Sequence, residues 1–174
     1  VVRNYRMEER FYTQNRLSNK PIIALLPGSR KQEIAKMLKG MLSIMKDFED
    51  YQFVIAGAPS MPLEFYEEIL QLNGDDLPYQ PPVLHNQTYD LLQHAKAALV
   101  TSGTATLETA LFNVPQVVCY KGSPISYFIA KRLVDLKYIS LVNLIVDRPV
   151  IKELIQDDFN EHNLRQELAK LLHP

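Results

Sequence analysis

The chain has 174 residues, of which 47% are apolar and 22% charged, a size and composition that suit one globular domain with a full core. Lys and Arg number 19 against 20 Asp and Glu, so the formal net charge of −1 leaves no broad basic field for nucleic acid or anionic lipid. The single cysteine, Cys119, excludes an internal disulfide framework and fits a reducing compartment.

Features of the sequence as a whole suggest a piece of a longer protein. No apolar run approaches the roughly 20 residues that a membrane-spanning helix needs, and no signal peptide is visible. The first residue is Val1 and not Met, and residues 3–16 form a charged amphipathic run. We therefore expect an excised domain whose preceding part is missing.

Short aliphatic runs alternate with amphipathic segments along the chain. Strands are predicted at 22–26, 51–56, 81–84, 97–100 and 116–120. Helices are predicted at 32–48 (weakened by Gly40), 63–72, 89–94, after 104, at 124–136, as a turn at 152–156, and at 160–172.

This alternation predicts an α/β fold, a Rossmann-like and mostly parallel sheet with helices on both faces. Ligands of such sheets bind at the carboxyl ends of the strands. The loops at 27–30 and 101–106 lie at such ends.

Small polar residues fill the second of these loops. Ser102, Thr104 and Thr106 supply hydroxyl groups, and Gly103 allows a ligand to approach the backbone closely. The first N–H groups of a helix lack internal partners, and the helix dipole favours negative charge there. A helix cap is the alternative, but a cap needs only one hydroxyl. The loop therefore predicts an anion site, and its spacing fits neither a P-loop nor a GxGxxG fingerprint.

Glu108, in the first turn of the following helix, does not suit a phosphate site. A carboxylate repels phosphate but accepts hydrogen bonds from a sugar diol, although a surface carboxylate remains the alternative. Phosphate donors together with a diol acceptor indicate a nucleotide or a nucleotide-sugar.

The loop after the first strand contains Gly28, Ser29 and Arg30, with Glu33 three residues on. Ser29 is a candidate N-cap, and the Arg30 guanidinium offers a fork of donors suited to phosphate. A plain strand–helix turn with a solvent-facing arginine is the alternative. A second anion loop at the same sheet edge favours the ligand, because two loops can clamp a diphosphate from both sides.

The remaining polar candidates are weaker. The four histidines show no metal-ligand spacing, although His85 closes a strand near the expected crevice. Cys119 lacks a catalytic partner pattern and is expected to be a buried hydrophobe. Asn143 lies in an apolar run, where a cap and a site role are equally favoured. Lys131 and Arg132 suggest a solvated helix edge more than a contact with phosphorylated substrate or membrane.

Several segments in order resemble the lipid-A-disaccharide synthases. The sequence LLPGSR at 25–30 with Glu33 resembles the family's LLPGSR-x-x-E segment, and SGTATLE at 102–108 resembles its SGTATLE segment. Further similarities cover PQVVCYK at 115–121, AKRLV at 130–134, YISLVNLI at 138–145 and KELIQ at 152–156. The resemblance extends over nearly the whole chain from Ile22.

This resemblance implies the C-terminal, donor-nucleotide half of a GT-B glycosyltransferase. The full enzyme would transfer 2,3-diacylglucosamine from UDP to 2,3-diacylglucosamine 1-phosphate, forming the β-1,6-linked lipid A disaccharide 1-phosphate. It would need no metal or other cofactor. It would work in the cytoplasm, peripherally on the inner face of the inner membrane of a Gram-negative bacterium, and would bind no nucleic acid.

The resemblance also implies roles for individual residues. Gly28, Ser29 and Arg30 would meet the diphosphate from one side, and residues of the second loop from the other: Ser102, Gly103, Thr104, Ala105 and Thr106. Glu108 would accept the ribose hydroxyls, the backbone at His85 and Asn86 would read uracil, and Asn143 falls on a position tied to substrate binding.

Two departures from the family pattern bear on these expectations. Val142 stands where the family usually has proline, and the domain that holds the acceptor pocket and the general base is absent, so no catalytic base is assigned. Residues 1–174 are thus expected to form one UDP-sugar-binding domain. The helices expected within 122–174 would pack on the missing domain or on a partner protomer of a homodimer.

Two alternatives remain at this stage. One is another UDP-sugar enzyme of the GT-B type, either a peptidoglycan N-acetylglucosaminyltransferase or a UDP-N-acetylglucosamine 2-epimerase. The other is a nucleotide-sugar binding module with no activity of its own.

Overall fold

The computed structural model describes residues 11–122 and 137–173, so the helix predicted at 124–136 lies outside the described residues. The strands are β1 (Ile22–Leu26), β2 (Gln52–Gly57), β3 (Val83–His85), β4 (Ala95–Thr101), β5 (Gln116–Tyr120) and β6 (Lys152–Ile155). The α-helices are α1 (Phe11–Gln14), α2 (Lys31–Leu42), α3 (Leu63–Leu72), α4 (Thr88–His94), α5 (Ala105–Leu111), α7 (Leu141–Val146) and α8 (Glu161–Leu172). Short 3-10 turns are η2 (Met45–Asp47), η3 (Gly74–Asp76) and η4 (Gln156–Asp158).

The six strands form one parallel sheet in the order β3-β2-β1-β4-β5-β6. The chain starts at β1 near the middle, winds outward to β3, and then returns to the other side of β1 with β4. This is the strand order of a doubly wound nucleotide-binding fold, and its direction of winding reverses between β1 and β4. The predicted α/β fold class is therefore confirmed.

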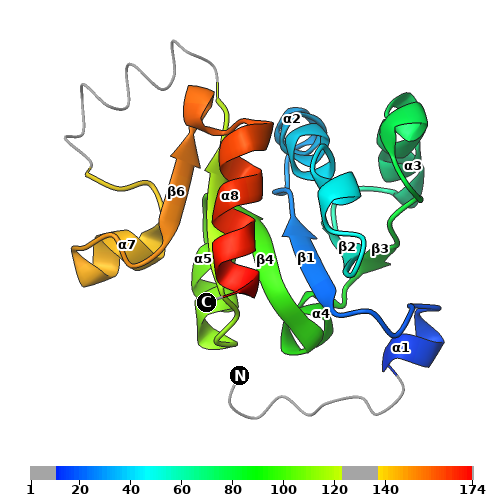
Figure 1. Cartoon of the computed structure of the whole chain (residues 1–174), viewed down its shortest axis with the longest axis horizontal. Coiled ribbons are helices and arrows are strands. Elements are labelled where there is room, and N and C mark those ends of the chain that lie inside the picture. The colour runs from blue at the N-terminus through cyan, green and yellow to red at the C-terminus, as the bar shows by residue number, and fades with distance from the viewer. Residues whose placement is uncertain (1–10, 123–136, 174) are drawn as a thin grey trace.

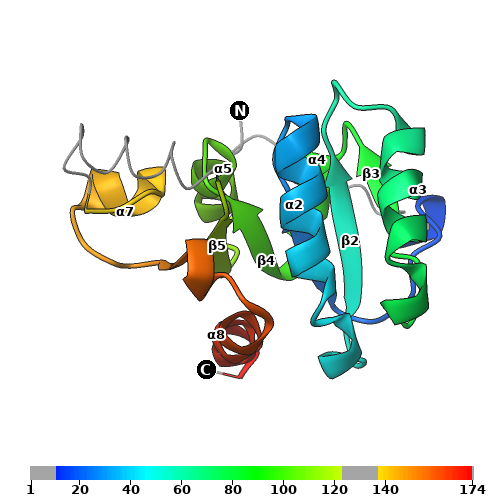
Figure 2. The same ribbon diagram turned by 90° about the horizontal axis from the view of Figure 1, so that it is seen from above.

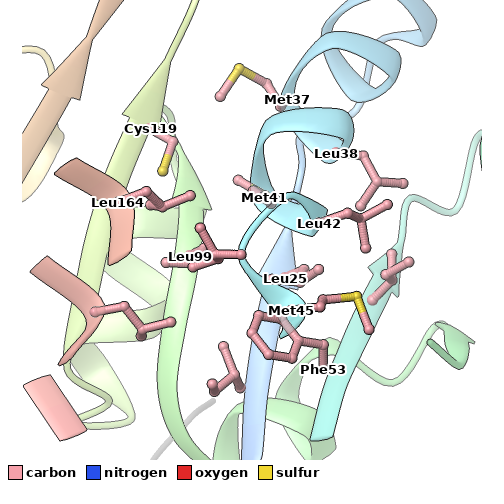
Figure 3. Close-up of a cluster of buried hydrophobic side chains, with 14 of the residues drawn as sticks. Leu25, Met37, Leu38, Met41, Leu42, Met45, Phe53, Leu99, Cys119 and Leu164 are labelled. Carbon is pink, nitrogen blue, oxygen red and sulfur yellow. The ribbon is translucent and has the colours of Figure 1, made fainter. Parts of the chain in front are cut away.

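Alternation along β1 divides the core between the two faces of the sheet. Ile23 and Leu25 face a cluster built with α2, α3 and α8. Ile22, Ala24 and Leu26 face a second cluster with α1 and α4. Every residue of β1 is buried, as expected for a central strand covered on both sides. Figure 1 shows α2 and α8 over the same face, and Figure 3 shows side chains of the cluster to which both helices contribute.

The helix predicted at 32–48 ends earlier, at Leu42. Ser43 follows as the C-cap, and its hydroxyl donates to the Gly40 carbonyl at 2.9 Å. A serine that bonds to the backbone in this way competes with the helical hydrogen bonds. The chain then forms η2, which carries Met45 into the core.

The prediction of a helical turn at 152–156 is wrong, because residues Lys152–Ile155 form the edge strand β6. This strand pairs with β5 from Val117↔Lys152 to Tyr120↔Ile155, and Leu154 is buried in the core. Glu, Leu and Gln favour helix locally, but pairing with the open edge of β5 overrides that propensity.

The C-terminal elements fold back onto their own sheet. In α8, Leu164, Leu168 and Leu172 are buried in the cluster that also contains Leu99 and Val117. Helix α7 instead lies out beyond β6 at one end of the sheet (Figures 1 and 2), and Ile145 on it is 70% exposed.

Gly40 provides a test of this packing. A Cβ at Gly40 would lie 2.5 Å from Cζ of Phe159, a ring that is 5% exposed. Alanine gains about 1 kcal/mol of helix propensity over glycine, whereas overpacking a core costs about 1–3 kcal/mol. We expect Gly40→Ala to lower the free energy of unfolding by about 1 kcal/mol in urea titrations.

Gly74→Ala is the matched control, because a Cβ there meets nothing within 4 Å. It should cause no loss of stability. A Gly40→Ala protein as stable as the parent would show that the Phe159 ring does not constrain this helix.

Candidate functional site

A pocket of about 300 Å³ opens at the carboxyl edge of the sheet, where the winding reverses. Its walls come from the loops that follow β1, β2 and β4, together with the first turns of α2 and α5. The order of the strands brings these loops together, although they are far apart in sequence. The pocket contains seven of the residues predicted from sequence: Gly28, Ser29, Ser102, Gly103, Thr104, Ala105 and Glu108.

Backbone N–H groups form one wall of the pocket. Among the described residues, the amides of Gly103, Thr104 and Ala105 make no hydrogen bond, while the amide of Ser102 donates to the Cys119 carbonyl at 3.3 Å. Gly103 has a φ of 148°, a conformation that glycine adopts without strain. Three unpaired amides at the start of a helix favour an anionic group.

Thr101 is a pocket residue that the sequence reasoning missed. It is 3% exposed, and its hydroxyl has no hydrogen-bond partner in the described part of the chain. A buried polar group without a partner is costly, so this hydroxyl is ready to bond to a ligand. Its place as the last residue of β4 was the available signal.

Glu108 lies in the pocket, one turn into α5. Partial burial raises the pKa of its carboxyl, because desolvation penalises the charged form. Hydroxyl donors from a ligand would offset that penalty by stabilising the carboxylate. The geometry thus suits a group that presents hydroxyls to Glu108.

The residue that caps the N-terminus of α2 differs from the one predicted from the sequence. Arg30, and not Ser29, is the N-cap residue of α2, and it makes no side-chain cap hydrogen bond. The backbone N–H of Ser29 donates to Oε2 of Glu33 at 3.2 Å. Gly28 has a φ of 107°, and a Cβ there would collide with the Glu33 carboxylate. The Glu33 side chain therefore lies directly over Gly28.

Arg30 is exposed and lies outside the pocket lining. Within residues 11–122 and 137–173, its guanidinium makes no hydrogen bond and no ion pair. The side chain is thus free of partners among the described residues, and it follows directly on Ser29, which lines the pocket.

Two hydroxyls expected to bind a ligand are used inside the protein. Thr106 is fully buried, and its Oγ1 donates to the Gly103 carbonyl at 2.8 Å. Ser102 does line the pocket, but its Oγ donates to the Ile139 carbonyl at 2.9 Å. Both bonds hold the loop in shape. The Thr106 hydroxyl is therefore engaged inside the protein, and its contact with a diphosphate stays a prediction.

His85 and Asn86 lie next to the pocket but do not line it. The His85 ring packs against Gly57 and meets Tyr66 edge-on at 5.7 Å. Its Nε2 is buried without a partner among the described residues. Asn86 is exposed with a φ of 56°. The predicted contact of this backbone with uracil stays a prediction.

Asn143 is a structural residue in this chain. It is fully buried, its Nδ2 donates to the Ile151 carbonyl at 2.8 Å and to the Glu153 carboxylate at 2.9 Å, and its Oδ1 accepts from the Ile151 amide at 2.9 Å. The same carboxylate accepts hydrogen bonds from Ser140 and from the Ile139 amide. The Asn143 amide thus joins α7 to β6, and the contact with substrate implied by the family resemblance stays a prediction.

Residues 57–59 and Thr88 also line the pocket, although no chemical pattern in the sequence singled them out. Within the described ranges, no group of three or more His, Cys, Asp or Glu side chains is arranged to hold a metal ion. The helices of those ranges include none with the length and apolar character needed to cross a bilayer.

Comparison with protein families identifies the relatives of this chain. Residues 4–174 match the family model described as lipid-A-disaccharide synthetase. The chain belongs to this family. This match decides against the alternative that the chain belongs to another family of UDP-sugar enzymes with a similar fold.

Lipid-A-disaccharide synthases from two bacteria illustrate the similarity. The enzyme from Sulfurihydrogenibium sp. is 32% identical over 99% of this chain and 47% of that protein. The enzyme from Persephonella marina is 35% identical over 94% of this chain and 45% of that protein. The chain thus spans less than half the length of these curated relatives.

Solved structures share the fold at low sequence identity. ADP-heptose LPS heptosyltransferase II from E. coli is 20% identical, with a TM-score of 0.58 over 96% of this chain and 52% of that one. The C-terminal CMP-Kdo binding domain of WaaA from Acinetobacter baumannii is 16% identical, with a TM-score of 0.54 over 95% of this chain and 87% of that one. UDP-GlcNAc 2-epimerase from Methanocaldococcus jannaschii is 13% identical, with a TM-score of 0.56 over 99% of this chain and 43% of that one. The similarity concerns the α/β fold.

The hydrogen bonds of Asn143 lead to a prediction about stability. Asn143→Ala removes both side-chain bonds to the part-buried N–H and C=O of Ile151, together with the bond to Glu153. We expect the free energy of unfolding to fall by about 2–4 kcal/mol, measured by urea unfolding. Asn73→Ala, which removes one bond to the Ile69 carbonyl, is the control and should cost about 1 kcal/mol or less. Equal stability of the Asn143→Ala and parent proteins would contradict the structural role.

Proposed function

We propose that this chain is the UDP-sugar-binding part of a lipid-A-disaccharide synthase. The observation that carries the proposal is one pocket in which unpaired amides at 103–105 lie across from the Gly28–Ser29 turn, with Glu108 beside them. A diphosphate needs donors on both sides, and a ribose needs a hydroxyl acceptor. The pocket offers both, and membership of the family supports a UDP-linked sugar as the ligand.

In the full enzyme, the donor would be UDP-2,3-diacylglucosamine and the acceptor 2,3-diacylglucosamine 1-phosphate. The acceptor hydroxyl oxygen forms a bond to the anomeric carbon, the bond from that carbon to UDP breaks, and the hydroxyl proton goes to a general base. The product is the β-1,6-linked disaccharide 1-phosphate. We assign the base to the part of the enzyme outside this chain.

The role of this chain in that reaction is to stabilise the leaving UDP. Negative charge grows on the diphosphate as the glycosidic bond breaks, and fixed backbone N–H groups stabilise that charge without reorganising. The amides at 103–105 and the hydroxyl of Thr101 supply such groups. Arg30, at the rim, would add a charged fork. The backbone at His85 and Asn86 would read uracil.

Wider features of the enzyme are proposed on the same basis. Residues 1–174 would form one donor-binding domain, inactive by itself, beside an acceptor domain that carries the base. The acyl chains of the substrates place the enzyme peripherally on the cytoplasmic face of the inner membrane. Residues 122–174 would take part in contacts with the acceptor domain or with a second protomer. Formation of disaccharide by residues 1–174 alone would contradict this division of labour.

Glu108 can be tested with UDP and its 2′-deoxy analogue. Because the carboxylate accepts ribose hydroxyls, Glu108→Ala should weaken UDP binding about tenfold in calorimetry. The analogue already lacks one hydroxyl, so the substitution should weaken its binding less. Equal losses for both ligands, or no loss for either, would remove Glu108 from the ribose site.

Arg30 can be tested by a substitution that keeps its charge. Arg30→Lys loses the planar fork, so donor affinity should fall about tenfold and turnover of the full-length enzyme should also fall. Arg148→Lys is the matched control, because Arg148 is exposed and lies outside the pocket. Unchanged affinity and turnover in Arg30→Lys would refute a diphosphate contact.

A further inference from the structure

Glu33 occupies the place where an anionic ligand would meet the loop after β1. Its Oε2 accepts the backbone N–H of Ser29 at 3.2 Å, and its carboxylate lies over Gly28. Gly28 lacks a side chain, and any Cβ there would collide with the carboxylate. The turn thus already binds an oxyanion, supplied by the chain itself.

The pocket contains two carboxylates, Glu33 and Glu108, although its donors favour an anion. The amides at 103–105 are unpaired, and the hydroxyl of Thr101, which is 3% exposed, has no partner among the described residues. These unpaired groups indicate a ligand site, and they do so without any evidence from the Gly28–Ser29 turn. A diphosphate brought into the pocket would repel a carboxylate that stays at Ser29.

We propose that Glu33 is an internal substitute for a ligand phosphate, which binds to the Gly28–Ser29 turn only after the Glu33 carboxylate has moved away. The inference rests on the proposed binding of a nucleoside diphosphate in this pocket. It adds that the Gly28–Ser29 turn is occupied by the Glu33 carboxylate in the ligand-free protein. Each binding event would then exchange this carboxylate for a phosphate of the ligand.

The structure makes this exchange easy. Glu33 has one hydrogen bond to the loop, that bond is solvent-exposed, and the residue lies in the first turn of α2. Lys36 is exposed three residues further along the same helix, and among the described residues its Nζ makes only a long, exposed bond to the Gly122 carbonyl at 3.4 Å, so the spacing allows it to pair with the displaced carboxylate. Glu33 therefore discriminates by charge, because a neutral ligand gains nothing from displacing it.

Calorimetry with UDP, inorganic pyrophosphate and uridine tests the proposal on the full chain. Glu33→Gln keeps the shape and an acceptor for Ser29 but removes the charge, so UDP and pyrophosphate should bind about tenfold tighter. Glu33→Ala should also bind them tighter, and uridine should be unaffected in both variants. Glu68→Gln, an exposed residue of α3 outside the pocket, makes the same change in net charge and should have no effect.

The outcomes separate this inference from the proposed function. If UDP binds the parent protein and Glu33→Gln binds it equally or more weakly, the carboxylate supports the turn and does not compete, and the inference is overturned while the function stands. If both Glu33 variants bind UDP and pyrophosphate more tightly than the parent protein does, and bind uridine equally well, the inference is supported. Failure of UDP to bind the parent protein would overturn the proposed function and the inference with it.

Discussion

The parallel pairing of β1 with β4 is the constraint on which the rest of the molecule depends. Residues Ile22 to Leu26 have β2 on one side and β4 on the other. The helices that follow β1 and β4 cover opposite faces of the sheet, so their connecting loops separate and leave a crevice between them. The pocket, the free amides and both anion loops lie at that point. Disrupting this pairing would remove the site along with the fold.

In the proposed anion site, main-chain N–H groups are free to bind a ligand, whereas two of the hydroxyl groups are not. The side chains of Thr106 and Ser102 donate within the protein, to Gly103 and Ile139, and thereby fix the course of the loop. Among the described residues, the backbone amides at 103–105 make no hydrogen bond. Backbone dipoles held by side-chain bonds are preorganised for a ligand whose charge grows during reaction.

The C-terminal segment supports the same loop from a distance. Ser102 bonds to the Ile139 carbonyl, the Ile139 amide bonds to Glu153, and Glu153 bonds to Asn143. Because Glu153 lies on β6, this chain of contacts connects the pocket to the edge of the sheet. Asn143 is therefore connected to the loop at Ser102 through this chain of hydrogen bonds.

The sequence by itself determined the alternation of strands and helices, the α/β class and the two loops, because these follow from hydrophobic period and from local turn residues. Tertiary structure alone decided that residues 152–155 extend the sheet, since the open edge of β5 provides hydrogen bonds that local propensity cannot foresee. It also decided that Asn143 is buried, that Thr101 faces the pocket and that Glu33 covers Gly28. The direction of a polar side chain depends on the partners that folding brings near it, and those partners come from distant parts of the chain.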